Sequence, residues 1–312
     1  MSPSISKLVL RPAALLKLLL RSFRTRWGIG LLHQRESVIG FCAEPPGPDA
    51  PRPRLLAVVT HVVSREQAAA VDGIKRERLV RTLESLLAGF AHCDLKIVIN
   101  TAPGRHLADS LPDSLRRRVE IVEQSDCDPM FVEFLAPDLF LRHRDDFDWF
   151  LFLEDDILLR DSWALDKLAF FNRATGDPSL LLTPHRFEML DGEKVYFDLN
   201  WNEGQKDFRW NRFATFETGG VKFGECANPH GACFCLNRAQ LDLWEKSGRH
   251  WKNRVVIVGP LESAATGCLF EAFTLYKPHP DNLRFFEVEH FDTKYSRMLA
   301  DLRKKNGEGS CI

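Results

Sequence analysis

The stretch Asp148-Trp149-Phe150-Leu151-Phe152-Leu153-Glu154-Asp155-Asp156-Ile157-Leu158-Leu159 places three acidic residues inside an apolar run. A short run of this kind predicts a buried strand of a mostly parallel sheet. Because ionised carboxylates are costly to bury without compensation, we expect the strand to end at Glu154. The acids then lie at the carboxyl end of the strand, where open α/β sheets bind ligands. Such oxygens suit Mg²⁺ or Mn²⁺ carrying a phosphate, and an ordinary acidic turn is the alternative.

The composition is that of a globular enzyme. Of the 312 residues, 45% are hydrophobic and 27% are charged, and the formal net charge is -1. No overall field favours nucleic acid, so we expect no nucleic-acid partner. The eight cysteines include no Cys-x-x-Cys pair, which argues against zinc-ribbon and thioredoxin-type sites. We interpret them as reduced thiols of a cytoplasmic protein, and their even number leaves a lumenal, disulfide-bonded alternative open.

The N-terminal segment, residues 1–43, differs from the rest of the chain. Six basic residues and no acidic residue lie between Lys7 and Arg26, among many leucines. No uncharged run approaches the roughly 20 residues that span a bilayer. A cationic, Leu-rich helix favours peripheral contact with a membrane surface, although an ordinary helix packed on the domain is also possible. A Pro-rich linker at residues 44–54 follows.

The chain from residue 55 to residue 298 alternates between strands and helices. Strands are predicted at 55–60, 95–101, 118–123, 149–154, 180–183 and 232–236, and helices at 74–89, 131–143, 163–173 (capped by Ser162) and 238–246. This order predicts a Rossmann-like, doubly wound α/β fold with a mixed sheet in a single domain. A charged tail at residues 299–312 ends the chain.

The order of motifs resembles that of a nucleotide-sugar glycosyltransferase of the GT-A fold, over residues 55–295. The resemblance rests on the polar turn Thr60-His61, a helix with Arg76, Arg78 and Arg81, a strand ending at Asn100-Thr101, the acidic Glu154-Asp155-Asp156, the stretch from His230 to Arg238, Glu262 at a helix start, and His290 near the C-terminus. The acidic motif is similar to the D-x-D-type motif of the family. It begins with Glu rather than Asp, so which acid meets ribose and which meets metal stays open.

The resemblance implies a role for each motif. Asp156 and His290 are expected to hold Mn²⁺ or Mg²⁺. The residues expected to bind the nucleotide-sugar donor are Thr60, His61, Arg78, Asn100, Glu154 and Asp155. Glu262 is expected to act as the base of an inverting reaction, which is favoured over a retaining one in which it would orient the acceptor. Contacts with a glycan or lipid-linked acceptor are assigned to Trp201, His230 and Gly231.

Other interpretations compete with this one. Arg78 can be an ordinary residue of a helix surface, Glu262 an acid favoured by a helix N-terminus, and His290 a core histidine. The competing functions are another metal-dependent nucleotide-processing enzyme, such as a nucleotidyltransferase or phosphohydrolase, and a catalytically inactive glycan-binding relative. The chain has no G-x-x-x-x-G-K-[ST] loop, which disfavours the first class, and the acidic triplet together with Glu262 disfavours the second.

Overall fold

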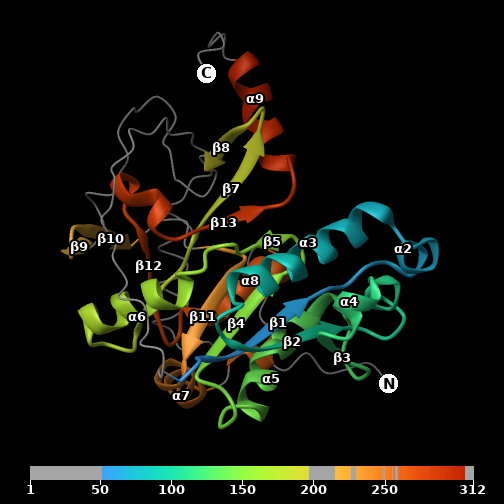
Figure 1. Ribbon diagram of the computed structural model, residues 1–312, viewed down its shortest axis with the longest axis horizontal. Coiled ribbons are helices and arrows are strands. Elements are labelled where there is room, and N and C mark those ends of the chain that lie inside the picture. The colour runs from blue at the N-terminus through green and yellow to red at the C-terminus, as the bar shows by residue number, and fades with distance from the viewer. Residues whose placement is uncertain are drawn as a thin grey trace.

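The computed structural model describes residues 51–196, 215–225, 230–248, 250–254, 256 and 259–305. Its centre is a five-stranded sheet in the order β11-β4-β1-β2-β3 (Figure 1). β1 to β4 run parallel, and β11 pairs antiparallel with β4. These strands span Arg54–Thr60 (β1), Asp94–Thr101 (β2), Val119–Glu123 (β3), Trp149–Glu154 (β4) and Cys233–Asn237 (β11). The predicted fold class, a doubly wound α/β fold with a mixed sheet, is confirmed.

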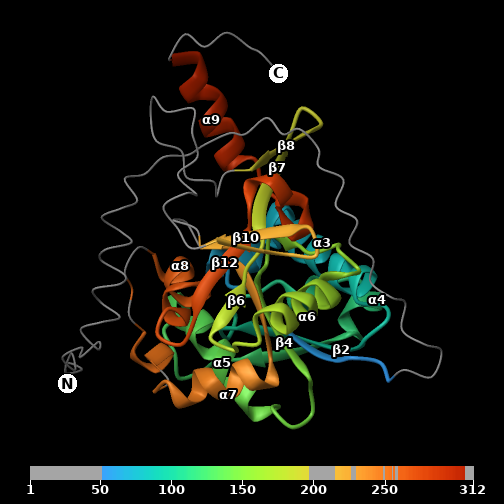
Figure 2. The same ribbon diagram turned by 90° about the vertical axis from the view of Figure 1, so that its left-hand side faces the viewer.

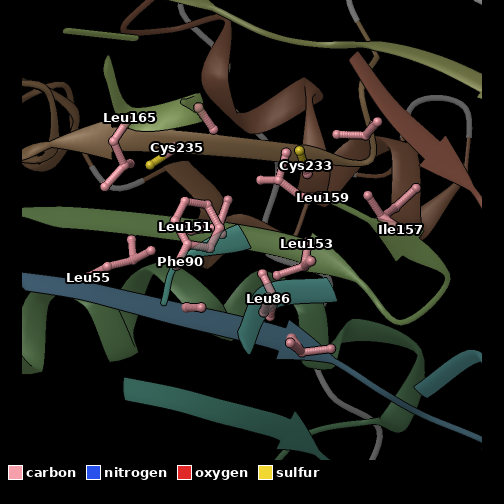
Figure 3. Close-up of a cluster of buried hydrophobic side chains, with 14 of the residues drawn as sticks. Leu55, Leu86, Phe90, Leu151, Leu153, Ile157, Leu159, Leu165, Cys233 and Cys235 are labelled. Atoms are coloured by element: carbon pink, nitrogen blue, oxygen red, sulfur yellow. The ribbon is translucent and has the colours of Figure 1, made fainter. Parts of the chain in front are cut away.

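Helices cover both faces of this sheet, which explains why β1, β4 and β11 are apolar and buried over most of their length. The edge strand β3 is more exposed and carries two glutamates. The helices of one face are α3 (Gly73–Gly89) and α6 (Ala164–Thr175), and those of the other are α5 (Ala136–Arg142), α7 (Arg238–Lys246) and α8 (Pro260–Ala265). Side chains alternate along β4, so Leu151 and Leu153 enter the first core while Phe150 and Phe152 enter the second. Figure 3 shows the first core around Leu151 and Leu153.

Two smaller sheets flank the centre. One has the order β6-β12-β10-β9 and the other β5-β13-β7-β8. Their strands are β5 (Ile157–Leu158), β6 (Leu180–Leu182), β7 (His185–Leu190), β8 (Glu193–Tyr196), β9 (Thr215–Thr218), β10 (Val221–Glu225), β12 (Thr274–Pro278) and β13 (Glu287–His290). β13 pairs antiparallel with β5, with His290 opposite Ile157. This pairing brings the C-terminal part of the chain beside the acidic turn.

The last helix, α9 (Lys294–Lys305), extends away from the central sheet together with β7 and β8 (Figures 1 and 2). The shorter helices are α2 (Arg65–Ala70), α4 (Asp113–Arg116), η1 (Ala108–Ser110), η2 (Pro129–Leu135), η4 (His250–Asn253), η5 (Gly267–Leu269) and η6 (Pro280–Phe285). Among the described helices, none combines the length and the apolar character needed to cross a membrane.

The helix predicted at 131–143 is divided into two parts, the 3-10 helix η2 and the α-helix α5. Pro137 has no N–H to donate to the carbonyl of Glu133, and the Ala136 N–H donates to that carbonyl instead. The division matters because η2 carries Glu133 toward the carboxyl end of the sheet.

Several predicted details need correction. The strand at 180–183 forms, but it pairs with β12 instead of joining the central sheet. The N-cap of α6 is Trp163 and not Ser162, and it makes no side-chain capping hydrogen bond. The predicted tail boundary at residue 298 falls inside α9. The segment 1–43 and most of the linker 44–54 lie outside the described residues.

Candidate active site

The turn Glu154–Asp156 joins β4 to β5 at the carboxyl end of the parallel strands. Two other segments hold its backbone. The Thr82 hydroxyl of α3 donates to the Asp155 carbonyl at 2.9 Å, and the Phe291 N–H, just after β13, donates to the Asp156 carbonyl at 2.7 Å. The turn is therefore fixed from both sides, and its three carboxylates have set positions.

Asp155 is bound by His61, which follows β1. The two side chains meet at 2.5 Å between His61 Nδ1 and Asp155 Oδ2, and the Leu107 N–H donates to His61 Nε2 at 3.1 Å. Because Nε2 accepts, Nδ1 carries the proton that is donated to Asp155. Burial acts to raise the pKa of Asp155, but this hydrogen bond and the nearby charges of Lys75 and Arg78 bring the pKa below its usual value. Asp155 is therefore held as a carboxylate.

This geometry gives His61 a structural role. The ring is fully buried, and both of its nitrogens are used inside the protein. It positions Asp155, and its predicted contact with a donor stays a prediction.

Asp156 lies between Arg78 and His290. Arg78 Nη1 is 3.8 Å from Asp156 Oδ2, and Arg78 Nη2 donates to Asp292 Oδ2 at 2.8 Å. The arginine therefore bridges the acidic turn and the loop after β13, instead of lying free on the helix surface. Burial and the charge of Asp155 raise the pKa of Asp156, and His290 and Arg78 offset this only in part.

His290 faces Asp156 with one nitrogen and a second carboxylate with the other. His290 Nε2 is 3.6 Å from Asp156 Oδ2, and His290 Nδ1 is 2.8 Å from Glu188 Oε1. Glu188 lies in β7 and also accepts the Ser296 N–H at 2.6 Å. The structure therefore brings together Asp156 and His290, the two residues predicted to hold a metal.

The chemistry of these atoms fits a divalent cation. Asp156 Oδ1 is shielded from solvent and has no hydrogen-bond partner in the described structure. A carboxylate oxygen suits Mg²⁺ or Mn²⁺, and an imidazole nitrogen suits transition-metal ions. Within the described residues, no three His, Cys, Asp or Glu side chains form a ready-made metal cage. Mg²⁺ usually takes one or two carboxylates and completes its shell with substrate phosphates and water, and Asp156 could serve as such a carboxylate.

A row of polar residues crosses the ends of three parallel strands. In the strand register, Thr60 lies beside both Glu154 and Asn100, so the three side chains share one face of the sheet. Thr60 Oγ1 and Glu154 Oε1 are shielded from solvent without a hydrogen-bond partner. The Asn100 amide donates to the Val132 carbonyl at 2.8 Å and accepts from Gln124 at 2.8 Å. Asn100 therefore holds η2 in place, which leaves its predicted donor contact unsupported.

Glu133 of η2 adds a further acid to this row. Its side chain is 9% exposed, and Oε2 has no hydrogen-bond partner. Burial raises the pKa of Glu133 to about 8, assisted by the charges of Asp155, Glu262 and Asp156. Burial and the charge of Asp156 likewise raise the pKa of Glu154 well above its usual value. Burial and the neighbouring negative charges therefore favour the protonated, uncharged form of both groups.

Glu262 reaches this group of acids from the first turn of α8. The helix packs against η2, and the charge of Glu262 contributes to the raised pKa of Glu133. Its side chain folds back over the N-cap residue Gly259, where an added Cβ would come within 2.2 Å of Glu262 Oε2. Glu262 as a residue is partly exposed.

The two remaining acceptor-side residues lie before β11. His230 Nδ1 is 2.8 Å from the Thr266 hydroxyl, and the fully buried Lys277 donates to the His230 carbonyl at 2.7 Å. An added Cβ at Gly231 would come within 3.3 Å of the Pro184 carbonyl, so the backbone packs tightly there. These contacts give both residues a structural role, and their predicted acceptor contacts stay predictions.

Three residues of the site were missed at the level of sequence: Glu133, Glu188 and Asp292. Glu133 is a single acid within an apolar segment, which is a usable signal because an isolated buried charge needs a partner or a function. Glu188 lies among His185, Arg186 and Asp191, so the sequence around it carries no such signal. Asp292 follows His290 by two residues, and proximity alone could have suggested it. Trp201, predicted to contact the acceptor, lies outside the described residues.

No protein-family model and no curated protein matches the chain. Among solved structures, mannose-1-phosphate geranyltransferase from Thermus thermophilus is similar with 13% identity, a TM-score of 0.38, and coverage of 72% of this chain and 73% of that one. The galactosyltransferase LgtC, in complex with donor and acceptor sugar analogues, has 12% identity, a TM-score of 0.34, and coverage of 71% and 72%.

A cytidylyltransferase from Leptospira borgpetersenii serovar Hardjo-bovis is similar with 14% identity and a TM-score of 0.36, over 84% of this chain and 98% of that one. A glycosyltransferase and a cytidylyltransferase are thus both among the structural neighbours. At these low TM-scores the similarities do not assign the chain to either class.

Proposed function

We propose that this chain is a metal-dependent transferase that takes a sugar from a nucleotide-sugar donor and moves it to a glycan or lipid-linked acceptor. The observation that carries the proposal is the meeting of Asp156 and His290 at the carboxyl end of the parallel strands. One oxygen of Asp156 has no partner within the described structure, and His290 is held from behind by Glu188. We infer that these two side chains form a ligand pair for a cation, and they lie in the place where such folds bind substrates.

Asp156 and His290 would hold Mn²⁺ or Mg²⁺, with further coordination from the donor diphosphate and water. When bound, the ion stabilises the negative charge that develops on a diphosphate leaving group. Arg78 and Lys75 lie on the same side of α3 and bring positive charge to the turn. Glu154 and Thr60 present shielded oxygens without partners, which suits hydrogen bonds from the ribose or from a metal-bound water.

Glu262 is the residue we propose as the base. A carboxylate that takes a proton from an acceptor hydroxyl must be reachable and close to the reacting atoms. Glu262 is partly exposed and lies near enough to the acidic turn to influence the pKa of Glu154. This supports direct displacement with inversion. In a retaining reaction, Glu262 would instead orient the acceptor.

A nucleotidyltransferase or phosphohydrolase would use the same cation and the same acidic turn, so it is the second candidate. The bond that breaks distinguishes these classes. A glycosyltransferase releases a nucleoside diphosphate from a UDP- or GDP-sugar, or CMP from a CMP-sugar, whereas a nucleotidyltransferase releases pyrophosphate from a nucleoside triphosphate. A glycan-binding relative without activity releases neither.

The basic N-terminal segment supports a place at a membrane surface, on the cytoplasmic side or, alternatively, in the secretory lumen. A lipid-linked acceptor would fit either place, because the donor is soluble and the acceptor is held in the membrane.

The test is a product assay on the full chain with Mn²⁺, Mg²⁺ or EDTA. UDP-, GDP- and CMP-sugars are supplied singly, and nucleoside triphosphates are supplied with sugar phosphates. We expect metal-dependent release of nucleotide from one sugar donor. Release of pyrophosphate would move the assignment to the nucleotidyltransferases. Equal release with EDTA and with Mn²⁺ would contradict the metal role of Asp156.

A further inference from the structure

Glu188 is a buried carboxylate that the proposed reaction does not use. It lies in β7, has no exposed surface, and accepts three hydrogen bonds. The donors are His290 Nδ1 at 2.8 Å, the Ser296 N–H at 2.6 Å and the Tyr295 N–H at 3.3 Å. The last two belong to the first turn of α9, where backbone N–H groups lack partners within the helix.

The backbone donors decide which of the two side chains carries the proton. An N–H group can only donate, and the Tyr295 and Ser296 N–H groups donate to Oε1 and Oε2 of Glu188, so both carboxylate oxygens act as acceptors. The proton between the two side chains therefore belongs to His290 Nδ1. In the neutral imidazole, Nε2 then presents its lone pair on the side where Asp156 Oδ2 lies 3.6 Å away.

We propose that Glu188 is a positioning residue that fixes the tautomer and the ring direction of His290, so that Nε2 is ready to bind a divalent cation together with Asp156. The inference rests on the proposed metal function. It adds that β7 and the start of α9 together fix the tautomer and the ring direction of the metal-binding histidine. A carboxylate behind a metal-binding histidine orients the ring and raises its basicity, and removing it typically weakens metal binding about 10- to 100-fold.

The structure supplies a matched control on the same small sheet. Glu287 of β13 is also a largely buried carboxylate, and it is bound by Lys194 and by the Tyr196 hydroxyl. It lies three residues before His290 in the same strand, whereas the carboxylate that His290 Nδ1 contacts is that of Glu188. Glu287→Gln therefore removes a comparable charge without removing the hydrogen bond to His290.

The experiment compares wild type, Glu188→Gln and Glu287→Gln by two measurements. The affinity for Mn²⁺ is measured by electron paramagnetic resonance without any substrate, and the nitrogen-15 shifts of the His290 ring are measured by NMR without metal. We expect Glu188→Gln to weaken Mn²⁺ binding at least tenfold and to alter the tautomer signal, while Glu287→Gln changes neither. Glu188→Asp, which keeps the charge, is expected to restore part of the affinity.

The outcomes separate the inference from the function on which it rests. If wild type binds Mn²⁺ and Glu188→Gln binds it equally well, or if Glu287→Gln weakens binding as much, the positioning role is wrong. If wild type binds no Mn²⁺, the proposed metal site is wrong. The nitrogen-15 shifts then still decide the tautomer, because an unchanged His290 signal in Glu188→Gln overturns the role of Glu188.

Discussion

The buried acid Glu133 gives a prediction whose size follows from its surroundings. Its pKa is raised from 4.5 to about 8 by burial and by the charges of Asp155, Glu262 and Asp156. Between these two values the folded protein keeps a proton that the unfolded chain has released, so stability falls as pH rises. From pH ~5 to pH ~7 this one group lowers the free energy of unfolding by about 2.5 kcal/mol. Glu133→Gln removes the effect.

The assay is urea unfolding in EDTA at several pH values. The free energy of unfolding of Glu133→Gln, relative to that of wild type, is expected to rise by about 2 to 3 kcal/mol between pH ~5 and pH ~7. Glu77→Gln, on an exposed part of α3, is the control and is expected to show no such gain. If the difference in free energy of unfolding between wild type and Glu133→Gln does not change with pH, Glu133 ionises in its ordinary range and the reasoning about its burial is refuted.

Three further predictions test other parts of the site. His61→Ala should lower kcat about 10- to 100-fold because it removes a buried hydrogen bond to a charged group. His61→Asn keeps an N–H donor and should recover part of the rate. A kcat of His61→Ala equal to that of wild type would contradict the positioning role. Glu262→Gln should lower kcat for transfer about 10²- to 10⁴-fold without changing Mn²⁺ affinity, and an unchanged rate would exclude it as the base. Deletion of residues 1–43 should abolish sedimentation with anionic vesicles and leave donor turnover intact, and loss of turnover would place the segment within the catalytic domain.

The central sheet was predictable because its strands carry their signal locally. The runs at 55–60, 95–101 and 149–154 are apolar whatever their neighbours are, and each matches an observed strand. The run at 180–183 is equally apolar, yet it belongs to another sheet. Membership of a sheet depends on pairing with β12, more than 90 residues later in the chain, and a local pattern carries no such information.

The candidate site was predictable in its members more than in their roles. Asp156 and His290 were expected to meet, and they do. His61 and Asn100 are polar residues at strand ends, as donor-binding residues would be, but the protein itself occupies their hydrogen-bonding groups. Glu188 meets His290 across 102 residues of sequence, so its role depends on the fold alone.

The most direct test of the central proposal is nucleotide release by wild type and Asp156→Asn, with Mn²⁺ and with EDTA. The control is Asp148→Asn, the same change just before the opposite end of β4, where the carboxylate pairs with Arg54. We predict that wild type and Asp148→Asn release nucleotide only with Mn²⁺, and that Asp156→Asn releases it at least 100-fold more slowly, a loss of about 2.7 kcal/mol of transition-state stabilisation. Metal-dependent release that persists in Asp156→Asn would contradict the proposal.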